Sequence, residues 1–337
     1  FRLRHQWERT TGAVARCRGR IRFRLGLDAK VNNQIKVAAG LATGSGDPRS
    51  TNQTLERTFS GKGINLDYAY LEYIPTLWAT VKAGKINSIE KVIFRPSDLL
   101  WDSDINPEGV SLLLSKKVDA FNLFMNTNWW VLSESSSDTS DPYMYVIQPG
   151  VKYSFDEKAQ LGLALAYYGF ENVKGALLAY ASGTNSGLTK TGDTVAGSLR
   201  YDYDSIAPSI ELGVKEPFGT TLPVPYLTVF CDYVYNVDPE EDNMGYLVGL
   251  KFGSEKIKKA KDWQVQYTYR RLEKDAWLDT FPDSDAYSGK TGVQGHEIVL
   301  SYGVGKNSSL GLDYYYMKKV GNSDKQEVFQ ADWQLKF

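Results

Sequence analysis

Apolar and polar residues alternate along most of the chain. Between Cys17 and Leu25, apolar or small residues alternate with arginines at every second position. A period of two predicts β-strands that have one apolar and one polar face. The same period recurs at 121–131, 143–155, 161–167, 227–235, 263–270 and 329–337. The pattern therefore predicts an all-β protein made of many strands of one kind.

Sixteen segments fit this pattern. The weakest is the first, where Phe1, Leu3, His5 and Trp7 alternate with polar residues; we retain it because single-chain bacterial barrels have even strand numbers. The predicted strands lie near 1–9, 16–30, 33–43, 64–74, 77–86, 109–118, 120–132, 143–155, 159–170, 206–215, 223–236, 244–253, 262–272, 294–304, 309–319 and 327–337.

The connections between these strands alternate in length. Short ones lie near 31–32, 75–76, 119, 156–158, 216–222, 254–261 and 305–308. Longer ones lie at 10–15, 44–63, 87–108, 133–142, 171–205, 237–243, 273–293 and 320–326. Short periplasmic turns on one rim and long external loops on the other are typical of outer-membrane barrels. We therefore expect one transmembrane antiparallel up-and-down β-barrel domain over 1–337, with about sixteen strands.

The width of such a barrel decides whether the apolar face of each strand points inward or outward. Sixteen strands leave a lumen that side chains cannot fill, so the polar face points inward and the apolar face contacts lipid. Aromatic residues near the strand ends, such as Trp129, Tyr143, Tyr153 and Trp333, fit the girdles at the membrane interfaces. In a soluble sandwich, the alternative, the same residues would fill a core.

Composition narrows the class of protein further. The 39 basic and 40 acidic residues balance, so the charge does not indicate a nucleic-acid partner. The longest largely apolar run, Leu161 to Phe170, is half of what a membrane helix needs. No signal peptide is visible, and because the chain starts inside a patterned segment we expect a processed or trimmed product. Cys17 and Cys231 make no disulfide framework and are expected on apolar faces.

The last strand contains a separate signal. Phe329, Trp333 and the terminal Phe337 occupy alternating positions. This arrangement resembles the signal by which the barrel-assembly machinery recognises outer-membrane proteins.

The chain as a whole resembles the bacterial sequences known as "putative porins". The likeness lies in RIRFRLGLDAKV at 20–31, GLATGSGDPRSTNQTL at 40–55, LDYAYLEY at 66–73, DLLWDSDINPEGV at 98–110 and GVQGHEIVLSYGV at 292–304. It implies an integral channel of the bacterial outer membrane for small hydrophilic solutes, and porins of this size are often homotrimers. Leu71 and Glu72 break the alternation of their strand, which indicates a bulge.

An arginine column is the first candidate functional feature. Arg16, Arg18, Arg20, Arg22 and Arg24 share one face of the second predicted strand, and Arg2 and Arg4 lie on the neighbouring strand with the same inward phase. A lipid-facing arginine costs roughly 2–4 kcal/mol at the membrane midplane, so we expect this column in the lumen. In a functional role, the column is a basic wall that guides anions or offsets acidic loop residues. In a structural role, it pairs with inward carboxylates of the barrel wall. The carboxylates in question are Asp28, Asp67, Glu211 and Asp332.

The loop at 87–108 is the second candidate. It lies between the fifth and sixth predicted strands, where general porins fold their third loop into the lumen. Its apolar Leu99, Leu100 and Trp101 would pack on the wall, and its charged residues would face the arginine column across the narrowest point. Those charged residues are Arg95, Asp98, Asp102, Asp104 and Glu108. The alternative is an external loop, or a plug without effect on selectivity.

The sequence also contains candidate residues for a metal site and for catalysis. Asp102, Asp104 and Asn106 offer hard oxygen ligands of the kind that suit calcium, as do Asp283 and Asp285, but Pro107 stands where a calcium loop needs glycine. We expect no metal and no cofactor. The two histidines, His5 and His296, are not tied to a nucleophile by any recognisable motif, so we expect no catalysis.

The sequence therefore favours a passive diffusion porin with mixed or mildly anion-favouring selectivity. A substrate-specific channel would carry a continuous track of aromatics or arginines in its lumen. An adhesion or structural barrel with a blocked lumen is the remaining alternative. The expected partners are outer-membrane lipid, the assembly machinery and small hydrophilic solutes.

Overall fold

The computed structural model describes residues 1–136, 139–190, 193–219 and 221–337. Strands dominate it, with two short 3-10 helices, η1 (Ile89–Lys91) and η2 (Tyr287–Gly289). The first half of the chain contains β1 (Arg2–Thr10), β2 (Arg16–Arg22), β3 (Arg24–Lys30), β4 (Ile35–Thr43), β5 (Gln53–Thr54), β6 (Ile64–Thr76), β7 (Ala79–Lys85), β8 (Glu108–Val118), β9 (Phe121–Val131), β10 (Tyr143–Ser154) and β11 (Ala159–Glu171). The second half contains β12 (Gly187–Lys190), β13 (Asp193–Leu199), β14 (Ser205–Lys215), β15 (Tyr226–Asn236), β16 (Met244–Gly253), β17 (Trp263–Leu272), β18 (Val293–Gly305), β19 (Ser308–Lys319) and β20 (Lys325–Leu335).

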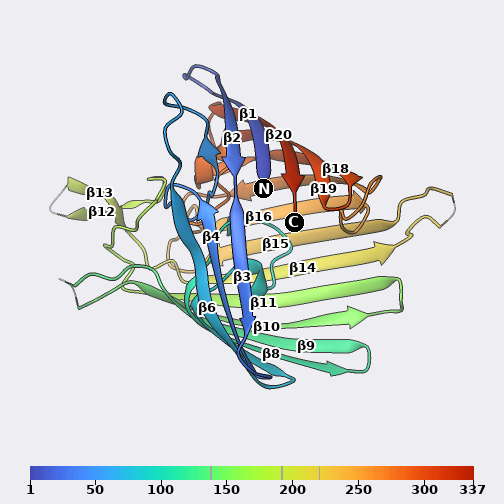
Figure 1. Ribbon diagram of the computed structural model, residues 1–337. Coiled ribbons are helices and arrows are strands. Elements are labelled where there is room, and N and C mark those ends of the chain that lie inside the picture. The colour runs from blue at the N-terminus through green and yellow to red at the C-terminus, as the bar shows by residue number, and fades with distance from the viewer. Residues whose placement is uncertain (137–138, 191–192, 220) are drawn as a thin grey trace.

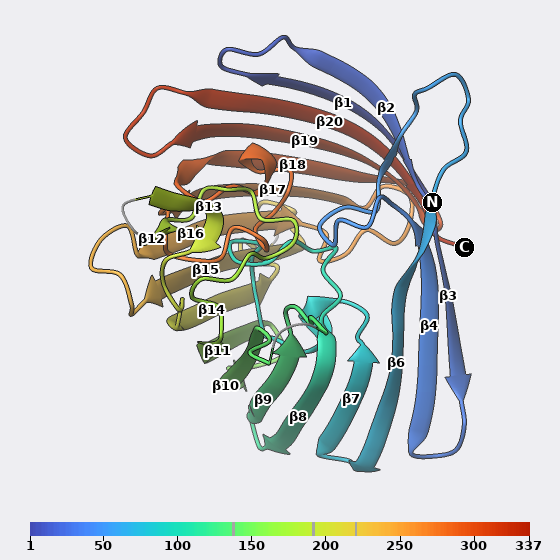
Figure 2. The same cartoon turned by 90° about the vertical axis from the view of Figure 1, so that its left-hand side faces the viewer.

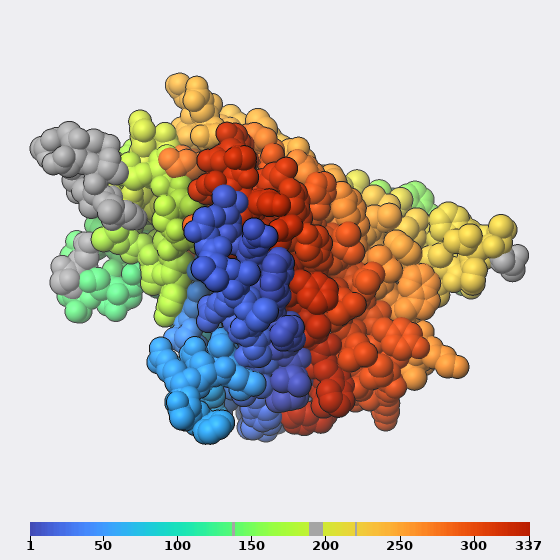
Figure 3. Space-filling model, turned by 90° about the horizontal axis from the view of Figure 1, so that it is seen from above, coloured from blue at the N-terminus to red at the C-terminus, as the bar shows by residue number. Residues whose placement is uncertain are grey.

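The strands pair with their chain neighbours in antiparallel order and curve around a central space (Figures 1 and 2). The first and last strands also pair, from Arg2 opposite Gln334 to Thr10 opposite Gln326. In the space-filling view the N-terminal segment accordingly lies directly against the C-terminal strands (Figure 3). The predicted up-and-down barrel architecture is confirmed.

Eighteen of the described strands belong to one sheet. β2 and β3 are consecutive parts of one long strand of the barrel, interrupted at Phe23, and β5 is only two residues long. When β2 and β3 are counted as one strand and β5 is left out, the sheet has sixteen strands, and their bounds follow the predicted segments closely. The interruption at Phe23 has a local cause, since its backbone N–H donates to the hydroxyl of Thr43 while its carbonyl accepts from the Thr43 N–H. Along β2 the partner on that edge is then β5 in place of β4.

The two faces of the wall have the predicted orientation. Leu3 on β1 is 42% exposed on the outside, whereas Arg4 beside it is 3% exposed on the inside. The buried polar residues of the other strands, such as Asn128, Gln148 and Thr268, also point inward. Burying polar groups within the ring while leaving apolar ones outside is the reverse of a soluble protein and matches a barrel surrounded by lipid.

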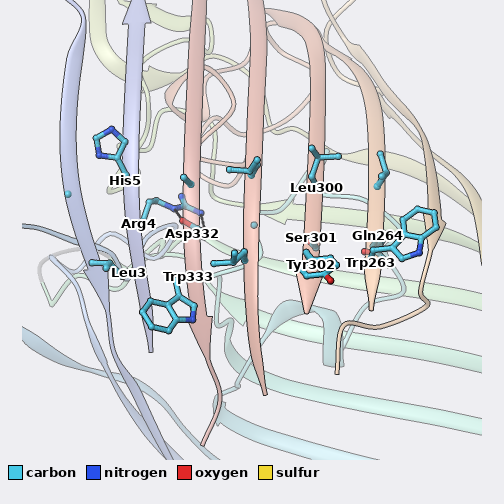
Figure 4. Close-up of a pocket in the computed structure, with 16 residues that line it drawn as sticks. Leu3, Arg4, His5, Trp263, Gln264, Leu300, Ser301, Tyr302, Asp332 and Trp333 are labelled. Carbon is cyan, nitrogen blue, oxygen red and sulfur yellow. Dashed lines mark hydrogen bonds and ion pairs between the residues drawn. The ribbon is translucent and has the colours of Figure 1, made fainter. Parts of the chain in front are cut away.

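The outer surface has an apolar depression of about 830 Å³ across β17–β20 and β1 (Figure 4). Leu3 and Leu300 lie within it, and Trp263, Tyr302 and Trp333 lie near the ends of their strands (Figure 4). The indole N–H of Trp333 donates to the hydroxyl of Ser308 at 3.1 Å. Aromatic residues with a polar tip at strand ends are typical of the girdle at a membrane interface.

β6 contains a bulge, but it lies at Asp67 and not at Leu71 and Glu72, which pair in register with Val37 and Lys36 of β4. Gly40 of β4 pairs with Tyr68, but Leu41 pairs with Leu66, so Asp67 is the extra residue. The bulge lets Leu66 and Leu71, which differ in phase, both lie on the outer face, where they are exposed. It also turns Asp67 toward the lumen, where it meets Arg24 and Asn106.

The connections separate into a rim of short turns and a rim of long loops (Figure 1). The predicted connections 133–142, 171–205 and 216–222 each include residues outside the described ranges. The loop after β11 contains a hairpin that the pattern did not predict, β12 paired with β13. Among the described helices, none is long and apolar enough to span a membrane.

Candidate functional site

The loop between β7 and β8, residues 86–107, runs through the interior of the ring. Its contacts reach strands on every side of the wall. Asn128 of β9 donates to the Val92 carbonyl, Gln148 of β10 bonds both backbone groups of Phe94, Asp232 of β15 accepts from Ser97, Arg270 of β17 pairs with Asp98, and Asn106 donates to Asp67 of β6. A loop tied to strands so far apart must cross the lumen.

Two glycines stand at the roots of this loop. Gly84 and Gly109 are directly opposite each other on β7 and β8, with φ of +119° and +148°. A Cβ at Gly84 would lie 2.4 Å from the Ala69 carbonyl oxygen, and one at Gly109 would lie 2.1 Å from that of Trp129. Both positions therefore need glycine, for its backbone freedom and for the close approach of the neighbouring strand.

An aromatic cluster fills part of the lumen beside the loop. Trp101 contacts Trp277 and Trp130 edge-on, with ring centroids 5.4 and 5.8 Å apart, and Phe281 at 4.6 Å. Trp101 and Trp130 are 2% exposed and Trp277 is fully buried. The Trp277 indole donates to the Leu100 carbonyl at 2.8 Å, so the polar edge of the ring is also satisfied. Trp101 thus packs on the wall, through Trp130 and Tyr168, and equally on a second loop, through Trp277 and Phe281.

That second loop, 273–292, was not predicted as part of the site. Asp275 and Asp279 accept hydrogen bonds from backbone N–H groups of the loop between β11 and β14, at Ser186 and Thr184. Asp285 pairs with Arg4 of β1 at 3.0 Å. The sequence did contain a signal, because the apolar run Ala276 to Leu278 is unusual in a solvated loop.

The arginine column lies on the inner face and meets carboxylates from both the wall and the loops. Arg2 and Arg4 pair with Asp332 of β20, which Arg4 contacts at 2.7 Å. Arg16 and Arg18 pair with Glu8, at 3.9 and 2.9 Å. Arg22 and Arg24 pair with Asp104 of loop 86–107, at 3.1 and 2.9 Å, and Arg24 also reaches Asp67 at 3.7 Å.

Strand register explains why the column needs loop carboxylates. Arg2 stands directly opposite Arg22, and Arg4 directly opposite Arg20. Like charges in direct cross-strand pairs repel each other. Asp104 and Asp285 are placed to offset this repulsion, so the position of both loops is coupled to the charge of the wall.

Arg20 is the exception within the column. It is 9% exposed, and its guanidinium donates to the Gln6 side-chain carbonyl at 3.0 Å and to the Ser50 hydroxyl at 3.3 Å. No carboxylate of the described residues lies within ion-pair distance of it. Of the predicted wall carboxylates, Asp67 and Asp332 pair with the column, whereas Asp28 and Glu211 form no ion pair within the described part of the chain.

The five charged residues predicted for loop 87–108 have different surroundings. Asp104 alone touches the arginine column. Asp98 pairs instead with Arg270 at 2.7 Å, Glu108 begins β8 and pairs with Lys85 at 2.6 Å, and Arg95 donates to the Trp101 carbonyl and lies 3.7 Å from Glu90. The charges of the loop thus contact the wall directly at several points, in place of one open gap between loop and column.

Asp102 joins the two lumen loops. Its carboxylate accepts from the backbone N–H of Asp104 at 2.9 Å and of Ser284 at 2.8 Å, and its own N–H donates to the Phe281 carbonyl. Burial, with the nearby Asp104 carboxylate, raises the pKa of Asp102 to about 7. Burial would also raise the pKa of Asp104, but Arg22 and Arg24 lower it below its ordinary value.

The calcium candidates have other partners in the structure. Asn106 accepts from the Ser88 N–H and donates to Asp67, while Asp102 binds backbone as described. Within the described ranges, no group of three or more His, Cys, Asp or Glu side chains is arranged to hold a metal ion.

Two cavities flank loop 86–107. One of about 110 Å³ is lined by residues including Thr43, Asp67 and Asp104. The other, of about 350 Å³, lies between Lys85, Trp130 and the loop after β11. Both adjoin the wall formed by β4 to β9, on the side of the lumen next to the Arg22 and Arg24 pairs.

The residues of the C-terminal signal lie on the outer side of the last strand or beyond it. Phe329 and Trp333 are exposed outward on β20. Phe337 follows the strand and stacks on Phe23, with ring centroids 6.2 Å apart.

The family model described as "putative porin" matches residues 8–202 and 194–337. The chain belongs to this porin family. The match spans nearly all strands of the ring, so the polar lumen and apolar exterior are those of an integral outer-membrane porin channel. No curated protein sequence matches the chain.

Solved porin structures share the fold at low identity. A triple mutant of the Rhodopseudomonas blastica porin is 10% identical, covers 99% of this chain and 98% of its own, and gives a TM-score of 0.51. In-vitro folded OmpT, an outer membrane protein of Vibrio cholerae described in its trimer form, is 13% identical, covers 98% and 96%, and gives 0.50. The fold is thus that of porin barrels, which are channels and not enzymes.

Proposed function

We propose that this porin conducts small hydrophilic solutes and ions by passive diffusion, with a mild preference for anions. The observation that supports this preference is the charge of the arginine column. Six of its seven guanidinium groups pair with five carboxylates, those of Glu8, Asp67, Asp104, Asp285 and Asp332. The column therefore keeps an excess of positive charge, and rings of charged side chains set the selectivity of a pore.

Arg20 contributes most to that excess because no described carboxylate neutralises it. Lysines add to it nearer the short-turn rim, where Lys152 lies 5.4 Å from the Phe94 ring of the lumen loop and Lys251 lies 5.8 Å from the inward-facing Phe230 ring. Neither lysine pairs with a carboxylate of the described residues. An anion would meet uncompensated positive charge at Arg20 and again at Lys152 and Lys251.

The lumen aromatics favour diffusion over a substrate-specific channel. A solute track needs aromatic faces open to the pore, but Trp130 and Trp277 both pack on Trp101 and all three rings are nearly inaccessible. They act as a core that holds the loops in place. The adhesion alternative predicts a barrel that inserts without conducting.

The test uses purified protein in planar bilayers under a salt gradient. Arg20→Gln removes one positive charge without leaving a carboxylate unpaired, so we expect the reversal potential to shift toward cation selectivity. Replacing Arg22 and Arg24 as well should enlarge the shift. The matched control is Arg57→Gln, in an exposed stretch of loop 44–63, which should leave the potential unchanged. An unchanged reversal potential in Arg20→Gln would refute the proposed selectivity. Protein that inserts into the bilayer but forms no channels would favour the adhesion alternative.

Assembly and partners belong to the same proposal. OmpT has been described as a trimer, and we extend that state to this chain as a homotrimer in outer-membrane lipid. Phe329, Trp333 and Phe337 are proposed to engage the barrel-assembly machinery. Mass measurement of the detergent-solubilised protein tests the trimer, and loss of surface-assembled protein after Phe337→Ala tests the signal.

A further inference from the structure

The turn between β16 and β17, residues 254–262, is rich in lysine. It contains Lys256, Lys258, Lys259 and Lys261 against only Glu255 and Asp262. All four lysine residues are exposed, and none forms an ion pair with a described residue. We refer to residues 254–262 as the lysine turn.

The backbone of the lysine turn is fixed against β18. The Lys261 N–H donates to the Gly303 carbonyl at 2.9 Å, and the Gly303 N–H donates to the Asp262 carbonyl at 2.8 Å. The Asn307 N–H reaches the Lys258 carbonyl at 3.3 Å. These three bonds hold the turn beside the next short turn of the periplasmic rim.

The contact with Gly303 also places the lysine turn on the lumen side. Tyr302 is 47% exposed on the outer face, so its neighbour Gly303 faces inward. A Cβ at Gly303 would lie 2.0 Å from the Lys259 carbonyl oxygen. The turn therefore folds under the inner face of the wall, and only glycine at 303 leaves room for it.

Asp262 bonds to the lysine backbone and forms no ion pair with the lysine side chains of the described residues. Asp262 accepts from the N–H groups of Lys258 and Lys259 at 2.8 and 2.9 Å. These two bonds lower the pKa of Asp262, so it stays ionised and keeps the turn in shape. The ammonium groups are left free at the periplasmic mouth.

We infer that the lysine turn is a binding site for small multivalent anions of the phosphate type at the periplasmic mouth of the channel. This inference rests on the proposed function as a diffusion channel. A mouth lined by charge of one sign raises the local concentration of the opposite ion, roughly tenfold or more. The turn acts separately from the arginine column, because the column lies on β1 to β3 and the turn joins β16 to β17.

The experiment records single channels of known orientation in bilayers of zwitterionic lipid. Inorganic pyrophosphate is added to one side at a time. We expect it to reduce the current at a concentration roughly tenfold lower from the periplasmic side than from the extracellular side. In the variant with all four lysines replaced by Gln, periplasmic block should weaken to the extracellular level, while block from outside stays unchanged.

Two controls isolate the charge and the placement of the turn. Replacing the same four lysines by Arg keeps the charge and should keep the block. Gly303→Ala keeps every charge but displaces the turn, so it should weaken periplasmic block in protein that still migrates as a folded barrel. Equal block in the wild type and the four-Gln variant would overturn the inference.

A final measurement distinguishes binding of soluble anions from binding of lipid headgroups, which offer the same phosphate chemistry. If anionic lipid in the bilayer abolishes the pyrophosphate block of the wild type and leaves the four-Gln variant unaffected, the site binds headgroups in place of soluble anions, and the inference in its soluble form is overturned. The outcomes are also distinct from those for the proposed selectivity. A failed Arg20→Gln shift with intact periplasmic block would refute the selectivity proposal alone.

Discussion

Arg270 offers the sharpest test of how the lumen loops are held. Its guanidinium is 3% exposed and contacts three carboxylates, Asp98 at 2.7 Å, Glu297 at 3.2 Å and Asp283 at 3.4 Å. Asp98 belongs to loop 86–107, Asp283 to loop 273–292 and Glu297 to the wall strand β18. One cation therefore joins both loops to the wall, and Arg270→Met removes its charge while keeping most of its length.

The size of the expected loss of loop docking in Arg270→Met follows from the burial of Arg270. Removing one partner of a buried ion pair costs about 3–5 kcal/mol, because the charge that remains is left without compensation. An energy of that size corresponds to roughly a 10²- to 10⁴-fold change in the docking equilibrium of the loops. The barrel itself should persist, since the pairing of β17 with β18 depends on backbone hydrogen bonds. We therefore expect folded channels whose two lumen loops are undocked.

The assay combines limited chymotrypsin digestion with single-channel recording. Cleavage after Trp101 should be slow in the wild type, where this side chain is 2% exposed, and fast in the variant. Single-channel conductance should rise because the loops no longer fill the lumen. The matched control is Arg271→Met, since Arg271 is 32% exposed and its pair with Glu273 should contribute no more than about 1 kcal/mol.

Neutralising two of the carboxylates that lose their partner should restore the docking of the lumen loops. In the triple variant Arg270→Met, Asp283→Asn, Glu297→Gln, slow cleavage and low conductance are expected to return at least in part. If Arg270→Met shows the wild-type digestion pattern and conductance, the guanidinium does not hold the loops and the reasoning is refuted.

Three further predictions concern the same loops. Because the pKa of Asp102 is raised from 3.8 to about 7, loop docking should be strongest below pH 3.8 and weaken as pH rises to about 7; digestion rates across this window should show that slope in the wild type and a smaller one in Asp102→Asn. Gly109→Ala should lower barrel stability by about 1–3 kcal/mol in urea titrations, because φ of +148° is strained for alanine and the neighbouring strand is too close. Gly12→Ala, at φ of +79° in open space, is its control and should cost less. Trp277→Ala should destabilise the docked loops by about 3–5 kcal/mol in thermal unfolding, and an unchanged transition would show that the aromatic cluster does not support them.

The barrel could be predicted from the sequence because its signal is local. Each strand shows its own alternation, as between Phe121 and Val131, and chain neighbours become spatial neighbours. The break in alternation at Leu71 and Glu72 indicated a bulge in this strand but not its position, because the extra residue, Asp67, is identified only by the pairing with β4. The interruption at Phe23 was not visible, because it depends on Thr43 of the neighbouring strand.

The loops were harder to predict because their contacts are distant in the chain. Arg4 and Asp285 are separated by 281 positions, and Arg270 and Asp98 by 172. Spacing along the sequence cannot show which carboxylate meets which arginine. The sequence pattern places the arginines of the column on one phase of two neighbouring strands, but their pairing with Asp104 and Asp285 depends on how two long loops fold.

The aromatic cluster has a consequence for the route of a solute. Trp101, Trp130 and Trp277 occupy part of the lumen, and the larger of the two cavities beside loop 86–107 lies between this cluster and the wall, with Trp101 and Trp130 in its lining. Passage through this barrel would consequently be off-centre, along a wall and not along the axis. The diameter of the ring then says little about the largest solute admitted, and a single substitution on that one wall could alter the size limit more than the loss of charge elsewhere.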